Sequence, residues 1–167
     1  MQFSVGDKVV HPQYGPGQIA GLVSRESIDG ATSYYVIDIP DQGLTLQVPV
    51  QKAEELGLRP VMPQSMLLKV LSTLGSAPCR LPDDAKQRQG QLDAEFKTGE
   101  VLPLARLVRD LTWYGQRAHL TKRDSDLLKH GQERLAAEMA LASGDSASDS
   151  VKLIGSTMAV ALAGASG

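Results

Sequence analysis

The chain has 167 residues, of which 42% are hydrophobic and 22% charged, a composition typical of a folded globular protein and not of a disordered one. The formal net charge of −2 at pH 7 gives no overall support for nucleic-acid binding, so any DNA contact has to come from a local patch. A single cysteine, Cys79, excludes an internal disulfide and a cysteine-based zinc site. With no signal peptide expected at the N-terminus, this predicts a cytoplasmic protein.

Short strands and turns are predicted for the first sixty residues. Val5 to Ile19 reads as a strand, a turn with proline and glycine, and a second strand. Residues 27–30 form a hairpin signal that ends in Asp-Gly, and residues 34–39 are β-branched or aromatic. Residues 44–48 alternate between apolar and polar. Four such strands predict a small β barrel over residues 1–60, because a flat sheet this short leaves one apolar face wet.

Helical spacing replaces the strand pattern after residue 60. The apolar run from Met66 is followed by Gly75, a second helix begins after Pro82, and a third carries leucines and valines from Val101. Thr121 and the acidic residue three positions later form a capping box for a fourth helix. The predicted fold class is therefore α+β in two domains, with a Tudor-like or SH3-like barrel, a helical domain over residues 61–145, and a short helix or flexible tail over residues 146–167.

The sequence contains no arrangement of residues typical of an active site. His11, His119 and His130 lie in different predicted elements without metal-ligand spacing. The Gly-Pro-Gly of residues 15–17 lacks the Lys-Ser/Thr ending of a phosphate loop and leads into a strand, so we interpret it as a turn. We therefore expect a protein that is not an enzyme and that needs no cofactor, metal or small-molecule substrate.

The opening motif Val5-Gly6-Asp7-Lys8-Val9-Val10-His11-Pro12-Gln13-Tyr14-Gly15 resembles the start of the CarD/CdnL family of bacterial transcription regulators. That first domain is also found in the transcription-repair coupling factor. The helical half continues the resemblance to CarD at Gly99-Glu100-Val101 and Val108-Arg109-Asp110-Leu111. The resemblance extends to about residue 143 and implies a regulator that associates with the nucleoid through RNA polymerase.

The resemblance implies that an exposed edge strand of the barrel binds the polymerase β subunit, with main-chain hydrogen bonds supplying much of the affinity. Arg25 matches one of two arginines that mark this contact in the family, whereas Gln47 stands at the position of the other. We therefore expect the contact to depend less on salt than in relatives with both arginines. The residues expected to bind the polymerase are Arg25, Leu44, Thr45, Leu46, Gln47, Val48 and Pro49.

The resemblance also implies that the helical domain contacts promoter DNA at the upstream edge of the transcription bubble, where a tryptophan of the family wedges into the minor groove and holds the open complex. Ala85 occupies the position of that tryptophan, and alanine lacks the flat apolar area a wedge needs. The chain's only tryptophan is Trp113. We expect Trp113 to pack between helices with its indole N–H at the rim, and a displaced wedge is the alternative.

Basic residues near Ala85 are expected to hold the DNA backbone. Lys86, Arg88, Lys122 and Arg123 are the candidates, in addition to Ala85 itself. Nearby aspartates dilute this patch, so we expect DNA binding to be weak for the protein alone and sufficient once it is tethered to the polymerase. The alternatives are a solvated face of mixed charge and, for the whole protein, a protein–protein adaptor with no direct DNA role.

Overall fold

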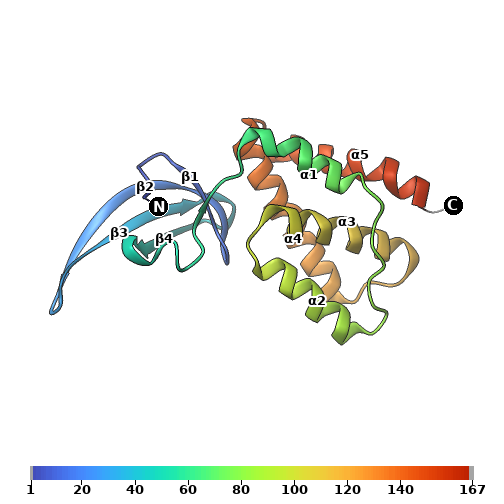
Figure 1. The fold of residues 1–167 in the computed structure, drawn as a ribbon, viewed down its shortest axis with the longest axis horizontal. Coiled ribbons are helices and arrows are strands. Elements are labelled where there is room, and N and C mark those ends of the chain that lie inside the picture. The colour runs from blue at the N-terminus through green and yellow to red at the C-terminus, as the bar shows by residue number, and fades with distance from the viewer. Residues whose placement is uncertain (1, 166–167) are drawn as a thin grey trace. The chain divides into compact units, whose positions relative to one another are not determined.

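The structure is a computed structural model that describes residues 2–165. The chain divides into two compact units, Met1–Val61 and Met62–Gly167. Figure 1 shows that strands build the first unit and helices the second, so the two-domain α+β class expected from the sequence is confirmed. Within the described residues, no helix is long and apolar enough to cross a membrane.

The first unit is a five-stranded antiparallel sheet in the order β4-β3-β2-β1-β5. Its strands are β1 (Lys8–His11), β2 (Gly15–Ser27), β3 (Gly30–Ile39), β4 (Leu44–Pro49) and β5 (Arg59–Pro60), with short 3-10 helices at Pro40–Gln42 and Val50–Lys52. The sequence predicts four of these strands. The fifth, β5, has only two residues and no pattern of its own, and it forms because Pro60 pairs with Val9 of β1.

Side chains point alternately to the two faces of each strand, and the apolar side chains on one face form the core of the first unit. One face of β3 buries Tyr35, Ile37 and Ile39, and the hydroxyl of Tyr35 accepts a hydrogen bond from the Phe3 N–H at 2.9 Å. This bond satisfies the phenol oxygen in the apolar interior. The cluster is completed by residues from the other strands and the following loop: Phe3, Val9, Ile19, Val48, Ala53 and Leu58.

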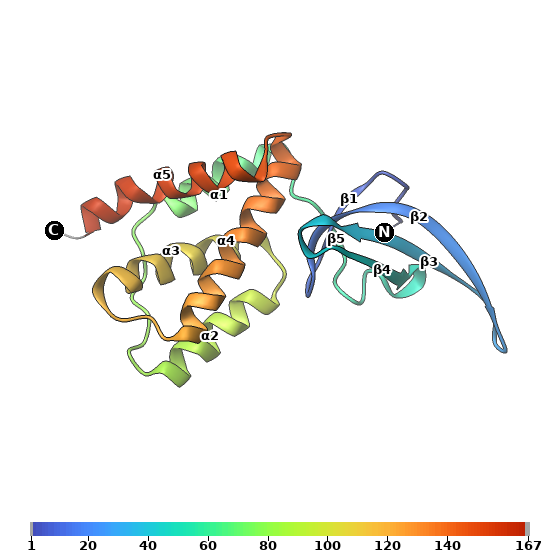
Figure 2. The ribbon, with the colours of Figure 1, turned by 180° about the vertical axis from the view of Figure 1, so that it is seen from behind.

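The second unit is a helical bundle (Figures 1 and 2). After a 3-10 turn at Gln64–Met66 come α1 (Leu67–Leu74), α2 (Ala85–Lys97), α3 (Val101–Arg117), α4 (Lys122–Ser143) and α5 (Ala147–Ala165). The predicted capping box forms at the start of α4, where the side chains of Thr121 and Asp124 each accept a hydrogen bond from the other's backbone N–H. At the centre of this bundle, α3 buries Leu104, Leu107, Val108 and Leu111.

The C-terminal helix α5 has 19 residues and is longer than the short helix or flexible tail expected from the sequence. Ile154, Met158 and Leu162 recur every four residues and are at most 5% exposed. This spacing places them on one face, which packs into the helical core beside α1 and α4. Packing against those helices therefore orders a segment whose glycines and serines weaken the local helix signal.

Candidate functional site

Strand β4 lies at one edge of the sheet, where it pairs with β3 in the register Ile37↔Leu46 and Tyr35↔Val48. Val48 is buried against the core, while Thr45 and Gln47 are exposed. An edge strand presents backbone N–H and C=O groups that the sheet itself does not pair. The segment Leu44 to Pro49 thus has the geometry that strand addition by a partner requires.

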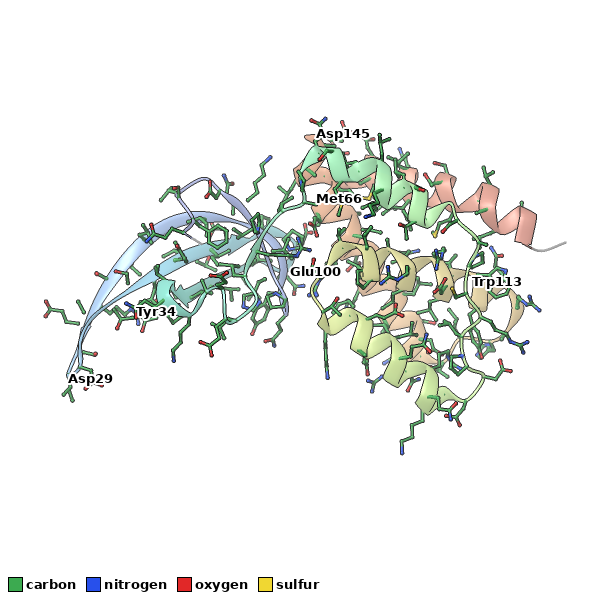
Figure 3. All side chains as sticks on the ribbon, viewed as in Figure 1. Asp29, Tyr34, Met66, Glu100, Trp113 and Asp145 are labelled. Atoms are coloured by element: carbon green, nitrogen blue, oxygen red, sulfur yellow. The ribbon has the colours of Figure 1, made fainter. Side chains whose placement is uncertain are left out.

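Arg25 lies on β2 opposite Thr32 of β3, two residue pairs beyond the end of β4. Its side chain is exposed, and its guanidinium carbon lies 5.9 Å from the centroid of the Tyr34 ring. The strand register places Arg25, Tyr34 and Gln47 on the same face of the sheet. Figure 3 shows Tyr34 on β3. The structure therefore places Arg25 beside Tyr34, which was not predicted from the sequence, and Gln47 on the same face of the sheet.

In the helical unit, the start of α4 lies beside the middle of α2, where Arg88, Gln89 and Asp93 contact it. Gln89 of α2 donates a hydrogen bond from Nε2 to Thr121 Oγ1 at 3.2 Å. Ala85 is the first residue of α2 and is exposed, as are Lys86 and Lys122. We use the name α2–α4 face for the exposed residues at the starts of these two helices, Ala85, Lys86, Lys122 and Arg123.

The prediction that Arg88 contacts DNA is wrong, because its side chain is buried. Arg88 is 2% exposed and forms a two-pronged ion pair with Asp124, with Nε–Oδ1 at 3.2 Å and Nη2–Oδ2 at 2.7 Å. Its third nitrogen, Nη1, donates to the Tyr114 hydroxyl and to the carbonyls of Pro82 and Asp83. Helical periodicity turns residue 88 inward, three positions after Ala85, so this guanidinium has no exposed nitrogen to offer a phosphate.

In the buried pair of Arg88 and Asp124, each side chain stabilises the charged form of the other. The hydrogen bond with Asp124 raises the pKa of Arg88 above its ordinary value despite the opposing effect of burial. For Asp124, burial alone raises the pKa, but hydrogen bonds from Arg88 and from the backbone and hydroxyl of Thr121 outweigh burial and hold the pKa below its ordinary value. Asp124 therefore stays charged at neutral pH and ties the start of α4 to α2.

Charge on the α2–α4 face is further reduced at Arg123. Its guanidinium Nη2 forms an ion pair with Asp93 Oδ2 of α2. The Arg123 side chain is still 62% exposed, so it can exchange this partner for a phosphate only by giving up the pair. Lys86 and Lys122 are thus the predicted DNA-contacting cations that project from this face without such a tie in the described part of the chain.

Trp113 is half-buried and packs against the helical core (Figure 3). Its Nε1 atom is buried and has no hydrogen-bond partner among the described residues, so the expectation of an indole N–H at the rim is wrong. Arg117 lies one helical turn further along α3, and its guanidinium carbon lies over the Trp113 ring at 4.6 Å from the ring centroid. Trp113 and Arg117 line a cavity of about 150 Å³, together with Arg80, Leu81, Asp83, Tyr114 and Ala118.

Two family models match this sequence. The CarD-like/TRCF RID domain matches residues 3–62, and the CarD C-terminal domain matches residues 69–155, more than half of the chain. The chain belongs to the CarD family. The CarD family resemblance seen in the motifs is thereby confirmed. The chain is also 28% identical over 144 residues to a Bacillus subtilis (strain 168) protein described as "Putative transcription factor YdeB", covering 85% of this chain and 93% of that relative.

The CarD family is a family of transcription regulators, and its first domain, shared with the transcription-repair coupling factor, is an RNA polymerase-interacting domain. In this CarD chain that domain coincides with the first unit and contains the edge strand β4. Within residues 2–165, no three His, Cys, Asp or Glu side chains gather in a way that could hold a metal ion.

The CarD motif Arg109-Asp110-Leu111 has a structural role in this chain. Arg109 is 5% exposed and donates to Asp110 Oδ1, to the Thr73 carbonyl and to the Ser76 hydroxyl. Asp110 in turn accepts a hydrogen bond from the Cys79 N–H at 2.9 Å. The pair therefore holds the loop between α1 and α2, and this loop leads to Arg80 and on to Ala85. The motif positions the α2–α4 face without being part of it.

Two residues of these surfaces, Tyr34 and Arg117, were not predicted from the sequence. Tyr34 pairs with Val23 on β2, so only the strand register brings its ring beneath Arg25. Arg117 follows Trp113 by four positions on a predicted helix, a spacing that places side chains on the same face. That second signal is visible in the sequence and could have identified Arg117 as the partner of the Trp113 ring.

Proposed function

We propose that this CarD-family regulator binds the β subunit of RNA polymerase through the edge strand β4 and Arg25. The observation that carries the proposal is the edge position of β4 in a domain that matches the family's polymerase-interacting domain. A strand of the partner added to β4 forms main-chain hydrogen bonds, and these do not depend on a charged residue at position 47. Arg25 contributes a charged contact on the same face of the sheet.

Reversing the charge of Arg25 is expected to weaken binding to the isolated β subunit about 10- to 100-fold, because a guanidinium contact becomes a repulsive carboxylate. The measurement is the dissociation constant of Arg25→Glu against wild type at low and at moderate salt. Arg80→Glu is the matched control, since it makes the same charge change on an exposed arginine of the helical unit. Unchanged affinity of Arg25→Glu would remove Arg25 from the interface.

We further propose that the helical unit contacts promoter DNA at the upstream edge of the bubble and so stabilises the open complex. Support comes from the α2–α4 face, where Lys86 and Lys122 are exposed beside Ala85. Arg80 precedes this face and is 77% exposed, and its ion pair with Asp83 at 3.4 Å is itself exposed to solvent, so a phosphate can replace this partner at little cost. Phosphate contacts of this kind are weak and independent of sequence, and attachment to the polymerase supplies the local concentration that they need.

Trp113 in this proposal supports the loop before α2 and does not enter the DNA. Its ring is half-buried and covered by Arg117, so insertion between bases requires both the core packing and this contact to be broken. A displaced wedge remains the competing proposal. In either case, Ala85, the position that the family resemblance assigns to the wedge, is exposed at the start of α2.

Restoring a large aromatic at the exposed position is expected to lengthen the open-complex lifetime about fivefold or more, because Ala85→Trp supplies the flat surface that can replace a lost base stack. Trp113→Phe, which keeps an aromatic in the core, is expected to leave the lifetime unchanged. No effect of Ala85→Trp together with a large loss in Trp113→Ala, without unfolding, would assign the wedge to Trp113. Footprinting of the same complexes tests the adaptor alternative, which predicts no protection upstream of the bubble.

A further inference from the structure

The junction between the two units is defined by two consecutive backbone amides. The Val61 N–H donates a hydrogen bond to the Lys8 carbonyl at 3.0 Å, and Lys8 belongs to β1 of the first unit. The Met62 N–H donates to Glu138 Oε2 at 2.9 Å, and Glu138 belongs to α4 of the second unit. Neighbouring peptide groups are therefore held by different units.

The surroundings of each of these two hydrogen bonds hold it in place, and we call the two bonds the anchors of the junction. On the first side, Pro60 pairs with Val9 in the β1–β5 ladder, immediately before the Val61 hydrogen bond. On the second side, Glu138 is 1% exposed, and the Met62 side chain is 5% exposed within the helical core. A hydrogen bond from an amide to a buried carboxylate is stronger than one between neutral groups. The anchored amides of Val61 and Met62 follow each other directly, so no unanchored residue lies between them.

Peptide planarity then restricts the possible motion to one residue. The peptide plane that carries the Val61 N–H moves with the first unit, and the plane that carries the Met62 N–H moves with the second. Between these planes lie only the φ and ψ angles of Val61, a β-branched residue with a narrow range of backbone conformations. We propose that Val61 is the single hinge residue of this protein and that Glu138 is the positioning residue that confines the hinge to Val61.

The hinge has a consequence that rests on the proposed function. A protein that holds the polymerase with one unit and DNA with the other gains from a short connection, because the first contact then raises the effective concentration of the second surface. A wider hinge spreads the second surface over a larger volume and lowers that concentration. We therefore expect hinge variants to shorten the open-complex lifetime while leaving binding to the β subunit unchanged.

The hinge is tested in the free chain by the distance distribution between two spin labels, one at Gln51→Cys and one at Lys129→Cys, in a Cys79→Ser background. Both labelled positions are exposed, one in each unit. Val61→Gly keeps both amide hydrogen bonds and opens the backbone range, so we expect the distribution to broaden about twofold. Glu133→Ala, an exposed glutamate of α4, is the control and should leave the width unchanged. An unchanged width in Val61→Gly overturns the proposal.

The role of Glu138 is tested by amide hydrogen exchange. In Glu138→Ala we expect the Met62 amide to exchange about tenfold faster while the Val61 amide stays within about threefold of wild type. Glu138→Gln keeps an oxygen acceptor and should retain most of the Met62 protection, which separates loss of the anchor from general unfolding. Equal changes at Val61 and Met62, or no change at Met62, refute the anchor. Because both measurements use the chain without polymerase, failure of polymerase binding would overturn the proposed function and not the hinge.

Discussion

Arg88→Ala is expected to destabilise the helical unit by about 3–5 kcal/mol, the usual cost of removing one partner of a buried ion pair. The truncation leaves Asp124, which is fully buried, without its guanidinium partner. It also removes the donor to the Pro82 and Asp83 carbonyls, just before α2 begins. Since domains have a total stability of about 5–15 kcal/mol, a large part of this unit's stability should be lost. Urea unfolding followed by far-UV circular dichroism measures the change.

Lys86→Ala is the matched control, because Lys86 lies on the same helix two positions earlier and is exposed. It should change the stability by no more than about 0.5 kcal/mol. The combined change Arg88→Met with Asp124→Leu removes both charges and should recover part of the loss, although the capping box of α4 is then broken. A cost below about 1 kcal/mol for Arg88→Ala contradicts the structural role of the pair.

The stability of the protein at acidic pH should also depend on the Arg88–Asp124 pair. The pKa of Asp124 is lowered below its ordinary value in the folded protein, so its contribution to stability is present above the pKa of an unfolded aspartate and is lost as the pH falls through the lower folded-state pKa. In Arg88→Ala the hydrogen bonds that lower this pKa are reduced to those from Thr121. The variant should therefore lose less stability than wild type as the pH falls below the range in which a free aspartate titrates, because the pKa of Asp124 is lowered less without Arg88.

Gly17→Ala is expected to destabilise the first unit by about 3 kcal/mol, the upper part of the range for overpacking. A Cβ atom at residue 17 would lie 2.3 Å from the Asp38 carbonyl oxygen and 2.7 Å from Ile39 Cδ1. The Ile39 side chain can rotate, but the carbonyl belongs to β3, so β2 and β3 have to separate. A unit of this size buries little core, and much of it should unfold. The loss of dispersed amide signals of the first unit in an NMR spectrum measures the effect.

Gly21→Ala provides the control on the same strand. A Cβ there would meet no atom within 4 Å, and the change should leave the stability within about 0.5 kcal/mol of wild type or raise it slightly. Binding to the polymerase β subunit should be lost in Gly17→Ala and kept in Gly21→Ala. Equal stability of the two variants would contradict this prediction, because it would show that β2 and β3 can separate at residue 17 at little cost in free energy.

Local patterns predicted most of the helical unit because helix signals act over a few residues. The capping box at Thr121 and the apolar spacing from Val101 each involve neighbours in the chain, and both elements form as expected. The length of α5 could not be predicted in the same way. Ile154 and Met158 order that helix only by packing against other helices, which lie far away in the sequence.

Motifs and periodicity predicted the family, four of the five strands, the first four helices and the opening turn, because these signals are local. Only the tertiary structure shows which charged side chains are buried and which are exposed. Arg88 and Lys86 are two positions apart and both positively charged, yet the first is buried against Asp124, 36 residues away, and the second is exposed. The anchors at Lys8 and Glu138, which place the hinge at Val61, are likewise distant contacts. No pattern of neighbouring residues encodes such pairings, because folding brings together groups that the sequence keeps apart.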